Sequence, residues 1–140
     1  MLTASVLAKT SDVPIYTVRH YTRIGLLQPK RNYGNNYQIY QPSDQARLNF
    51  IVTAKELGFT LNEIKNILDE AENGHSPCPM VREIIEKHLT ENRQKIKKLE
   101  KLQTKMEAAK QQWSKMKNST PDGHSVCRLI EFVAELENNA

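Results

Sequence analysis

The sequence is poor in cysteine, in large aromatic residues and in long apolar runs. Its 140 residues include two Cys, one Trp and three Phe. Two cysteines are too few for a disulfide scaffold and suit a reducing cytosol. No apolar run approaches the roughly 18–20 residues of a membrane span, and Met1–Ser5 show no basic segment followed by an apolar stretch. We therefore expect a cytoplasmic protein with one ordinary domain, or a small domain with an extended appendage, and no membrane partner.

Charge is distributed in blocks, although the net charge is only +4. Residues 1–49 hold six Lys/Arg against two Asp/Glu, and residues 79–117 hold eleven against five. Two other segments are acidic. Residues 50–78 hold two Lys/Arg against five Asp/Glu, and residues 118–140 hold one Lys/Arg against four Asp/Glu. A basic N-terminal third is an electrostatic footprint for nucleic acid. For the second basic block we favour a solvated helix face.

Glycine and proline mark the boundaries of short predicted elements in the first half of the chain. A helix capped by Thr3 and a second helix opened by Pro14 and stopped by Gly25 resemble a helix-turn-helix. A small β-hairpin is predicted over 31–40. Ser43 is expected to cap a third helix that runs to about 57, and Thr60 with Glu63 to form the capping box of a fourth helix that Gly74 ends.

The stretch from Pro79 to about Lys117 contains no internal glycine or proline and predicts one long helix. Its seam positions follow a mean period near 3.5, typical of a coiled coil, and they are 81, 85, 88, 92, 96, 99, 102, 106, 109, 113 and 116. About 39 residues give a rod of about 58 Å. Such a rod needs a second long helix to cover its seam, so we expect a homodimer. A last helix is predicted over about 126–137.

All five tyrosines, 16, 21, 33, 37 and 40, lie within 25 residues among several arginines and lysines. Phenolic hydroxyl and guanidinium groups both donate to phosphate oxygens, so the cluster favours contact with DNA. The alternative for Tyr21 and Tyr40 is packing between a helix and the hairpin.

Several segments together strongly resemble the MerR family of winged-helix regulators. The matching segments are Val6–Lys9, Val13–Tyr21, Gly25–Pro29, Tyr37–Tyr40, Phe50–Ile51, Leu57–Leu61 and Glu63–Ile64. The resemblance implies a mostly α fold: a winged helix-turn-helix domain with a second helix pair (1–75), a dimerisation helix in an antiparallel coiled coil (76–117), and an effector loop with a terminal helix (118–140). It implies a non-enzymatic dimer on promoter DNA that distorts the DNA when the effector binds, so that RNA polymerase engages both promoter elements.

The resemblance also implies which side chains meet DNA. Thr17, Arg19 and His20 would face the major groove and its phosphates, with Arg31, Asn36 and Tyr37 on the wing. With Tyr16 and Tyr21 from the tyrosine cluster, these are the expected DNA-binding residues. Two positions depart from the family pattern, because His20 stands where a tyrosine is usual and Gln38 where the wing arginine is usual.

The short C-terminal segment resembles that of the metal-sensing members of the family. In an antiparallel pair, Cys78 before the long helix of one subunit approaches His124 and Cys127 after the long helix of the other. Thiolate and imidazole suit zinc and neighbouring soft ions, and a helix N-terminus favours the thiolate of Cys78. We expect a divalent thiophilic effector (zinc, cadmium, lead or mercury) held by Cys78, His124 and Cys127, with Asp122 or His75 as a possible further ligand. His88 is interpreted as a packing or register residue.

An alternative from the same fold is a redox or electrophile sensor in which Cys78 or Cys127 is the reactive thiol. An enzyme is not expected, because the sequence holds no nucleophile constellation beyond these residues and no phosphate-cradling glycine loop.

Overall fold

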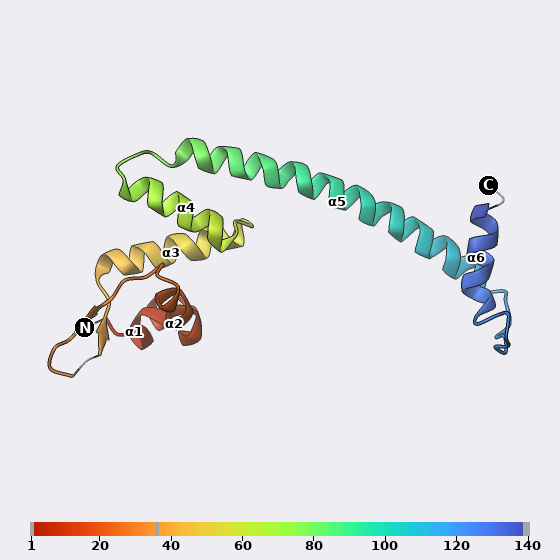
Figure 1. Ribbon diagram of the computed structural model, residues 1–140, viewed down its shortest axis with the longest axis horizontal. Helices are drawn as coiled ribbons and strands as arrows, with labels where there is room; N and C mark the ends of the chain where they lie inside the picture. The colour runs from red at the N-terminus through yellow and green to blue at the C-terminus, as the bar shows by residue number, and fades with distance from the viewer. Residues whose placement is uncertain (1, 36, 139–140) are drawn as a thin grey trace. The chain divides into compact units, whose positions relative to one another are not determined.

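A computed structural model describes residues 2–35 and 37–138 (Figure 1). The chain divides into two compact units, Met1–His88 and Leu89–Ala140. In chain order the elements are α1 (Ala4–Thr10), α2 (Ile15–Arg23), β1 (Lys30–Arg31), β2 (Gln38–Ile39), α3 (Pro42–Glu56), α4 (Leu61–Glu72), α5 (Cys78–Trp113) and α6 (Arg128–Asn138). The predicted mostly α architecture, with a winged helix-turn-helix and one long helix, is confirmed.

The first helix pair forms as its capping residues predict. The Thr3 hydroxyl accepts from the Val6 amide at 3.3 Å and so caps α1. Gly25 follows α2 at φ +85, a left-handed conformation that favours glycine. The chain then folds back, and the amides of Leu26 and Leu27 donate to the Tyr21 carbonyl.

The wing is a minimal antiparallel hairpin tied back to α2. Lys30 pairs with Ile39 and Arg31 with Gln38. Beyond β2, the Tyr40 amide donates to the Leu2 carbonyl at 2.7 Å, and the Tyr40 hydroxyl lies 2.6 Å from Thr22 Oγ1. These two bonds fix the base of the wing against α1 and α2.

The start of α3 differs from the sequence prediction. Gln41, not Ser43, is the N-cap residue, and Pro42 occupies the first turn. The Asp44 carboxylate accepts from the Gln41 amide at 2.9 Å and from the Gln28 amide at 3.3 Å. A carboxylate three residues into the helix satisfies amides that the first turn leaves open, so it replaces the expected serine cap.

The second helix pair forms as predicted. Thr60 Oγ1 accepts from the Glu63 amide at 3.1 Å, and Glu63 Oε1 accepts from the Thr60 amide at 2.8 Å. The capping box at the start of α4 is therefore confirmed, and Gly74, at φ +79, follows its end.

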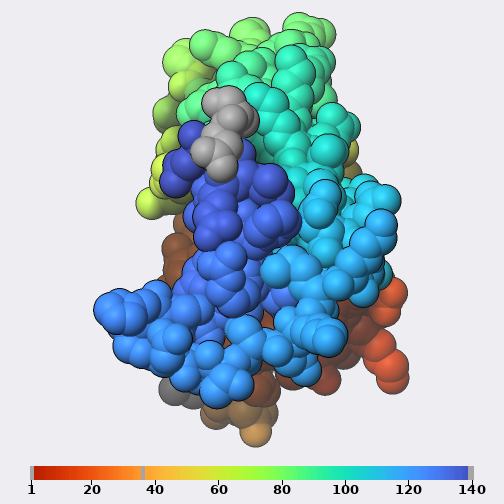
Figure 2. Space-filling model, turned by 90° about the vertical axis from the view of Figure 1, so that its right-hand side faces the viewer, coloured from red at the N-terminus to blue at the C-terminus, as the bar shows by residue number. Residues whose placement is uncertain are grey.

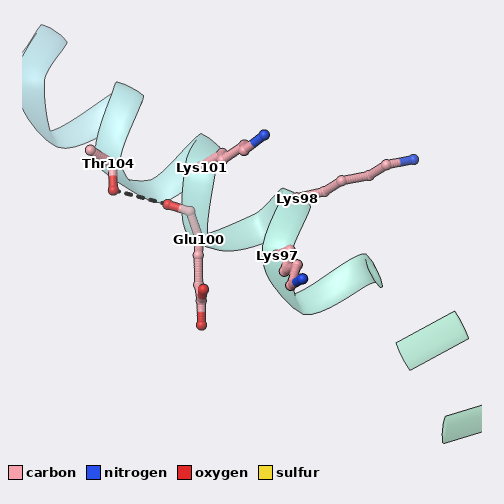
Figure 3. A pocket seen from close by; sticks show the side chains of 5 residues that line it. All are labelled: Lys97, Lys98, Glu100, Lys101 and Thr104. Atoms are coloured by element: carbon pink, nitrogen blue, oxygen red, sulfur yellow. Dashed lines mark hydrogen bonds between the residues drawn. The ribbon is translucent and has the colours of Figure 1, made fainter. Parts of the chain in front are cut away.

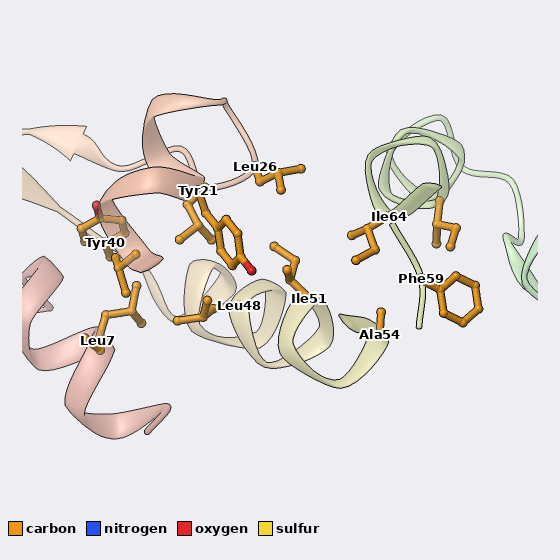
Figure 4. Close-up of a cluster of buried hydrophobic side chains, with 13 residues drawn as sticks. Leu7, Tyr21, Leu26, Tyr40, Leu48, Ile51, Ala54, Phe59 and Ile64 are labelled. Carbon is orange, nitrogen blue, oxygen red and sulfur yellow. The ribbon is translucent and has the colours of Figure 1, made fainter. Parts of the chain in front are cut away.

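One hydrophobic core joins the elements of the first unit (Figure 4). Its most deeply buried large side chains are Leu7, Val18, Leu27, Leu48, Ile51, Ile64 and Ile67. The first turns of α5 add Met80, Val81, Ile84 and Ile85 to its edge. The predicted coiled-coil seam is therefore wrong for positions 81 and 85, because these side chains already pack against the first unit.

The second unit joins the rest of α5 to α6. Figure 2 shows the two helices side by side, with the connecting loop at the start of α6. The Trp113 indole N–H donates to the Leu129 carbonyl at 2.7 Å, and Lys105 pairs with Glu137. Helix α5 ends at Trp113, earlier than the predicted 117, and α6 begins at Arg128 rather than 126.

Two surface features of α5 stand out in the second unit. Apolar side chains remain between 40% and 63% exposed, and they are Leu89, Ile96, Leu99, Leu102 and Met106. Lys97, Lys98 and Lys101 line an exposed hollow together with Glu100 and Thr104, and Figure 3 shows the Lys98 and Lys101 side chains pointing away from that of Glu100. No helix within residues 2–35 and 37–138 is long and apolar enough to cross a membrane.

Candidate nucleic-acid interface and metal ligands

Helix α2 presents two different faces. Val18 is fully buried and Tyr21 is 8% exposed, whereas Tyr16 is 72% exposed and Arg19 is also exposed. Thr17 is half-buried. Tyr16, Thr17 and Arg19 are therefore accessible to a partner.

Tyr21 is a correction to the expected DNA-binding set. Its ring lies in the core near Leu26, Leu48 and Ile51 (Figure 4), and burial raises the pKa of its hydroxyl. Tyr40 is also buried, at 2% exposed. Both tyrosines are therefore packing residues in this chain: Tyr40 lies between α2 and the wing, whereas Tyr21 packs towards α3.

His20 has a defined hydrogen-bonding state. Arg23 Nη2 lies 2.9 Å from His20 Nδ1, and an arginine can only donate. Nδ1 is therefore an acceptor, which leaves Nε2 to carry the imidazole proton. His20 can thus offer an N–H donor where the family usually places a tyrosine hydroxyl.

The wing carries Arg31 and Tyr37, both of which are exposed. The Asn32 side chain accepts from the Gly34 amide at 2.9 Å, and the Asn35 side chain accepts from the Tyr37 amide at 3.1 Å. These bonds shape the tip of the hairpin. Asn36, an expected wing contact, lies outside the described residues.

One hollow brings the helix pair and the wing together. It is lined by the start of α1, by Ile15 and Arg19 of α2, and by Tyr37 and Gln38 of the wing. The guanidinium of Arg19 and the phenol of Tyr37 are thus placed on one surface, where both can donate to phosphate.

Positive charge dominates the exposed residues of the stretch 1–49. Residues 1–49 contain only two acids, and one of them, Asp44, is 6% exposed with its carboxylate turned to backbone amides. The exposed charges are consequently Asp12 against Lys9, Arg19, Arg23, Lys30 and Arg31. Such a surface attracts a polyanion and gives affinity that falls with salt.

The two cysteines flank α5. Cys78 is its first residue and is exposed, and the Cys78 amide donates to Ser76 Oγ at 3.4 Å. Cys127 is half-buried directly before α6, and its carbonyl accepts from the Glu131 amide. Both thiols thus stand at helix N-termini.

The loop before α6 is held by its own carboxylates. Asp122 Oδ1 accepts from the His124 amide at 2.7 Å and from the Ser125 amide at 2.9 Å. Glu131 accepts from Ser125 Oγ and from the Val126 amide, and the Ser125 hydrogen bond is the main cause of its lowered pKa. Both carboxylates are engaged with the loop itself, while the His124 side chain is exposed.

A complete metal site is absent from the described part of a single chain, which holds no group of three His, Cys, Asp or Glu side chains able to hold an ion. His75, a possible further ligand, lies 3.6 Å from Glu70 through Nδ1 and Oε2. The grouping of Cys78 with His124 and Cys127 stays a prediction, since it requires two chains.

Comparison with known proteins decides the family. The family model "MerR HTH family regulatory protein" matches residues 2–71, and "MerR, DNA binding" matches residues 45–109. The chain belongs to the MerR family. Members of this family are non-enzymatic regulators that bind promoter DNA as dimers, so the expected DNA partner and the expected lack of enzymatic activity are confirmed at the family level.

Similar MerR proteins include several with metals in their names. The HTH-type transcriptional regulator HmrR of Rhizobium leguminosarum is 34% identical over 100 residues, which cover 71% of this chain and 77% of HmrR. The mercuric resistance operon regulatory protein of Shigella flexneri is 35% identical over 104 residues, which cover 74% and 70%. The regulator PbrR691 of Ralstonia metallidurans, solved with lead(II), shares the fold at a TM-score of 0.74 and 23% identity, over 94% of this chain and 99% of PbrR691.

Sequence reasoning missed three residues that shape this surface. Asp44 anchors the start of α3, Thr22 holds the wing through Tyr40, and Arg23 orients His20. The three-residue spacing of Gln41 and Asp44 is a capping-box signal that could have revealed the first. The Arg23–His20 contact follows from the i,i+3 spacing of two residues on α2, whereas the Thr22–Tyr40 contact depends on tertiary packing and left no signal in the sequence.

Proposed function

We propose that this MerR-type regulator controls a metal-resistance or metal-homeostasis promoter, which it activates by distorting the DNA when it binds a divalent thiophilic ion. The observation that carries the proposal is the placement of the thiols: Cys78 begins α5, and Cys127 follows the end of α5 with His124 beside it in the chain. Relatives named for mercury resistance and a fold neighbour holding lead(II) support a metal effector.

The proposed site is shared between two subunits. A continuous helix of 36 residues is about 54 Å long, so residues at its two ends cannot ligate one ion. In an antiparallel dimer, Cys78 of each subunit meets the loop of the other subunit. Two equivalent sites result, each with Cys78 from one chain and His124 with Cys127 from the other. Zinc, cadmium, lead and mercury suit such sulfur and nitrogen donors.

The apolar stripe on α5 supports the dimer. Leu89, Ile96, Leu99, Leu102 and Met106 recur at helical spacing and stay largely exposed in one chain. A second α5 would cover them in the manner of a coiled coil.

The DNA contacts proposed here are Tyr16, Thr17, Arg19 and His20 of α2 and Arg31, Asn36 and Tyr37 of the wing. The joint hollow of Arg19 and Tyr37 supports a phosphate contact at the point where helix and wing meet. RNA polymerase at the same promoter is the proposed second partner, and the cytoplasm the proposed location.

A heterodimer experiment tests the shared site. Cys78→Ser and Cys127→Ser chains carrying different tags are combined, and the mixed dimer is isolated and titrated with Zn²⁺, Cd²⁺, Pb²⁺ and Hg²⁺ while thiolate absorption is followed. One site keeps both cysteines, because Cys127 of the first chain meets Cys78 of the second. We expect about half the wild-type metal stoichiometry, as one of two independent sites remains whole.

The control is a wild-type chain paired with a chain carrying both substitutions. Under the shared arrangement neither site in this dimer keeps both cysteines, so tight binding should vanish. If the control binds half the metal and the mixed dimer binds none, each site lies within one subunit and the proposal is wrong.

A redox or electrophile sensor is the second candidate, and it is favoured by the exposure of Cys78 and the partial exposure of Cys127, both free thiols. Elemental analysis and thiol mass spectrometry separate the candidates. Stoichiometric bound metal supports the first, whereas promoter activation by thiol modification without metal supports the second.

A further inference from the structure

One carboxylate of the first unit joins three elements. Glu63 Oε1 accepts from the Thr60 amide at 2.8 Å, which closes the capping box of α4. The same oxygen lies 2.8 Å from His88 Nε2, and Oε2 lies 3.1 Å from that nitrogen. His88 lies in the third turn of α5, so the turn before α4 and the dimerisation helix share this carboxylate.

The aromatic residue of the same turn also meets His88. Phe59 is 4% exposed, and its ring lies edge-on to the imidazole with centroids 6.2 Å apart. Gly58, at φ +93, sets the turn that carries Phe59 and Thr60. His88 therefore contacts the α3–α4 turn through both its hydrogen bond and its ring.

Apolar contacts also hold α5 against this unit. Met80, Val81, Ile84 and Ile85 pack against the core through apolar surface. Apolar contacts are non-directional, so they allow a helix to slide or rotate slightly. A hydrogen bond requires a donor–acceptor distance near 3 Å and a good angle, so the His88–Glu63 contact sets the axial position of α5.

We propose that His88 is a positioning residue that couples α5 to the α3–α4 turn through Glu63. A displacement of the dimerisation helix moves His88, and the carboxylate that caps α4 moves with it. This proposal rests on the DNA-binding function and explains how a signal on α5 reaches the DNA-binding unit. Because allosteric coupling is reciprocal, the binding of operator DNA must also change the local stability of α5, with or without an effector.

The test compares amide hydrogen exchange in residues 80–92 of full-length dimers, free and bound to operator DNA. His88→Leu keeps an apolar side chain against Phe59 but has no donor. His88→Gln keeps an N–H donor that can reach Glu63. Lys87→Leu makes a similar change at the neighbouring exposed position and serves as the control.

We expect operator binding to slow amide exchange in residues 80–92 of wild type, of His88→Gln and of Lys87→Leu. In His88→Leu, the exchange rates of the same residues should be equal with and without operator DNA. In free His88→Leu, the Thr60 and Glu63 amides should exchange about fivefold faster, since one hydrogen bond is worth roughly 1 kcal/mol. The apo operator affinity of His88→Leu should stay within about twofold of wild type, because apolar packing of α5 is retained.

Two results would overturn the proposal. The first is an operator effect on α5 that persists in His88→Leu, and the second is the absence of any operator effect in wild type. Failure of the metal-sensing proposal is a separate outcome. It would appear in the metal titration of wild type, whereas the exchange comparison uses operator DNA and no metal.

Discussion

Four carboxylates of this protein accept hydrogen bonds from its own backbone. Asp44, Glu63, Asp122 and Glu131 each accept from main-chain amides near the start of a helix or in a loop. Each thereby satisfies donors that a helix start or tight turn leaves open. The consequence is that these four acids serve the fold.

Glu63→Gln should show the stabilising role of this carboxylate in the pH dependence of the free energy of unfolding. The pKa of Glu63 lies below its usual 4.5, first because of the Thr60 amide hydrogen bond and then because of His88. A lowered folded-state pKa contributes stability that is fully present above the unfolded value and is lost as pH falls through the folded value. Urea unfolding should therefore show that wild type is more stable than Glu63→Gln at neutral pH. The difference in unfolding free energy between the two should decrease as the pH falls below 4.5. A gap that stays constant to about pH 3 would contradict this role.

Arg19→Ala tests the proposed phosphate contact on α2. The affinity for operator should fall, and the slope of log affinity against log salt should shrink by about 0.9 for each phosphate that Arg19 neutralises. Fluorescence anisotropy over a salt series provides both values. Arg82→Ala, which removes an exposed charge from α5, is the matched control and should leave the slope unchanged. Equal slopes for wild type and Arg19→Ala would remove Arg19 from the interface.

Among the elements, α5 changes its role along its length. Its first turns complete the hydrophobic core of the first unit, its middle carries exposed leucines beside lysines, and Trp113 at its end holds α6 through the Leu129 carbonyl. The exposed stripe from Leu89 to Met106 is the part of α5 left for a partner helix.

Leu99→Asp combined with Leu102→Asp tests that role. Two unpaired carboxylates in a covered seam carry a desolvation cost of several kcal/mol, so monomers should appear and operator binding should be lost. Sedimentation velocity measures the change. Gln94→Asp with Gln111→Asp adds the same charge at exposed polar positions and should remain dimeric. Dimers of the leucine variant would show that α5 is not the dimer interface.

At the scale of the whole molecule, local signals predicted most of the fold. Thr3, Pro14, Gly25 and the Thr60–Glu63 capping box mark helix boundaries that the structure reproduces within a few residues. Packing decided the remainder. Heptad spacing alone could not show that Val81 and Ile85 face the core rather than a partner helix.

The candidate sites were predictable to different degrees. Outward positions of α2 follow from helical spacing, and the same spacing places Tyr21 on the inward face, three residues after the buried Val18. The proposed ligand set is harder to predict, because a long helix separates the two cysteines in the sequence and the proposal needs two chains to bring them together. Nothing local in the sequence links His88 to Glu63, since the two lie 25 residues apart.

Because α5 is one unbroken helix from Cys78 to Trp113, all of its residues share one helical phase. Each residue inserted after Leu89 would rotate everything beyond it by about 100° and advance it by about 1.5 Å relative to His88. One added residue would thus change the angle between the leucine stripe and His88 by about 100°, while seven would restore it to within about 20°. Exchange of effector segments between such regulators is therefore constrained by angle, and the permitted length changes are those near a whole number of helical turns, such as about seven, eleven or eighteen residues.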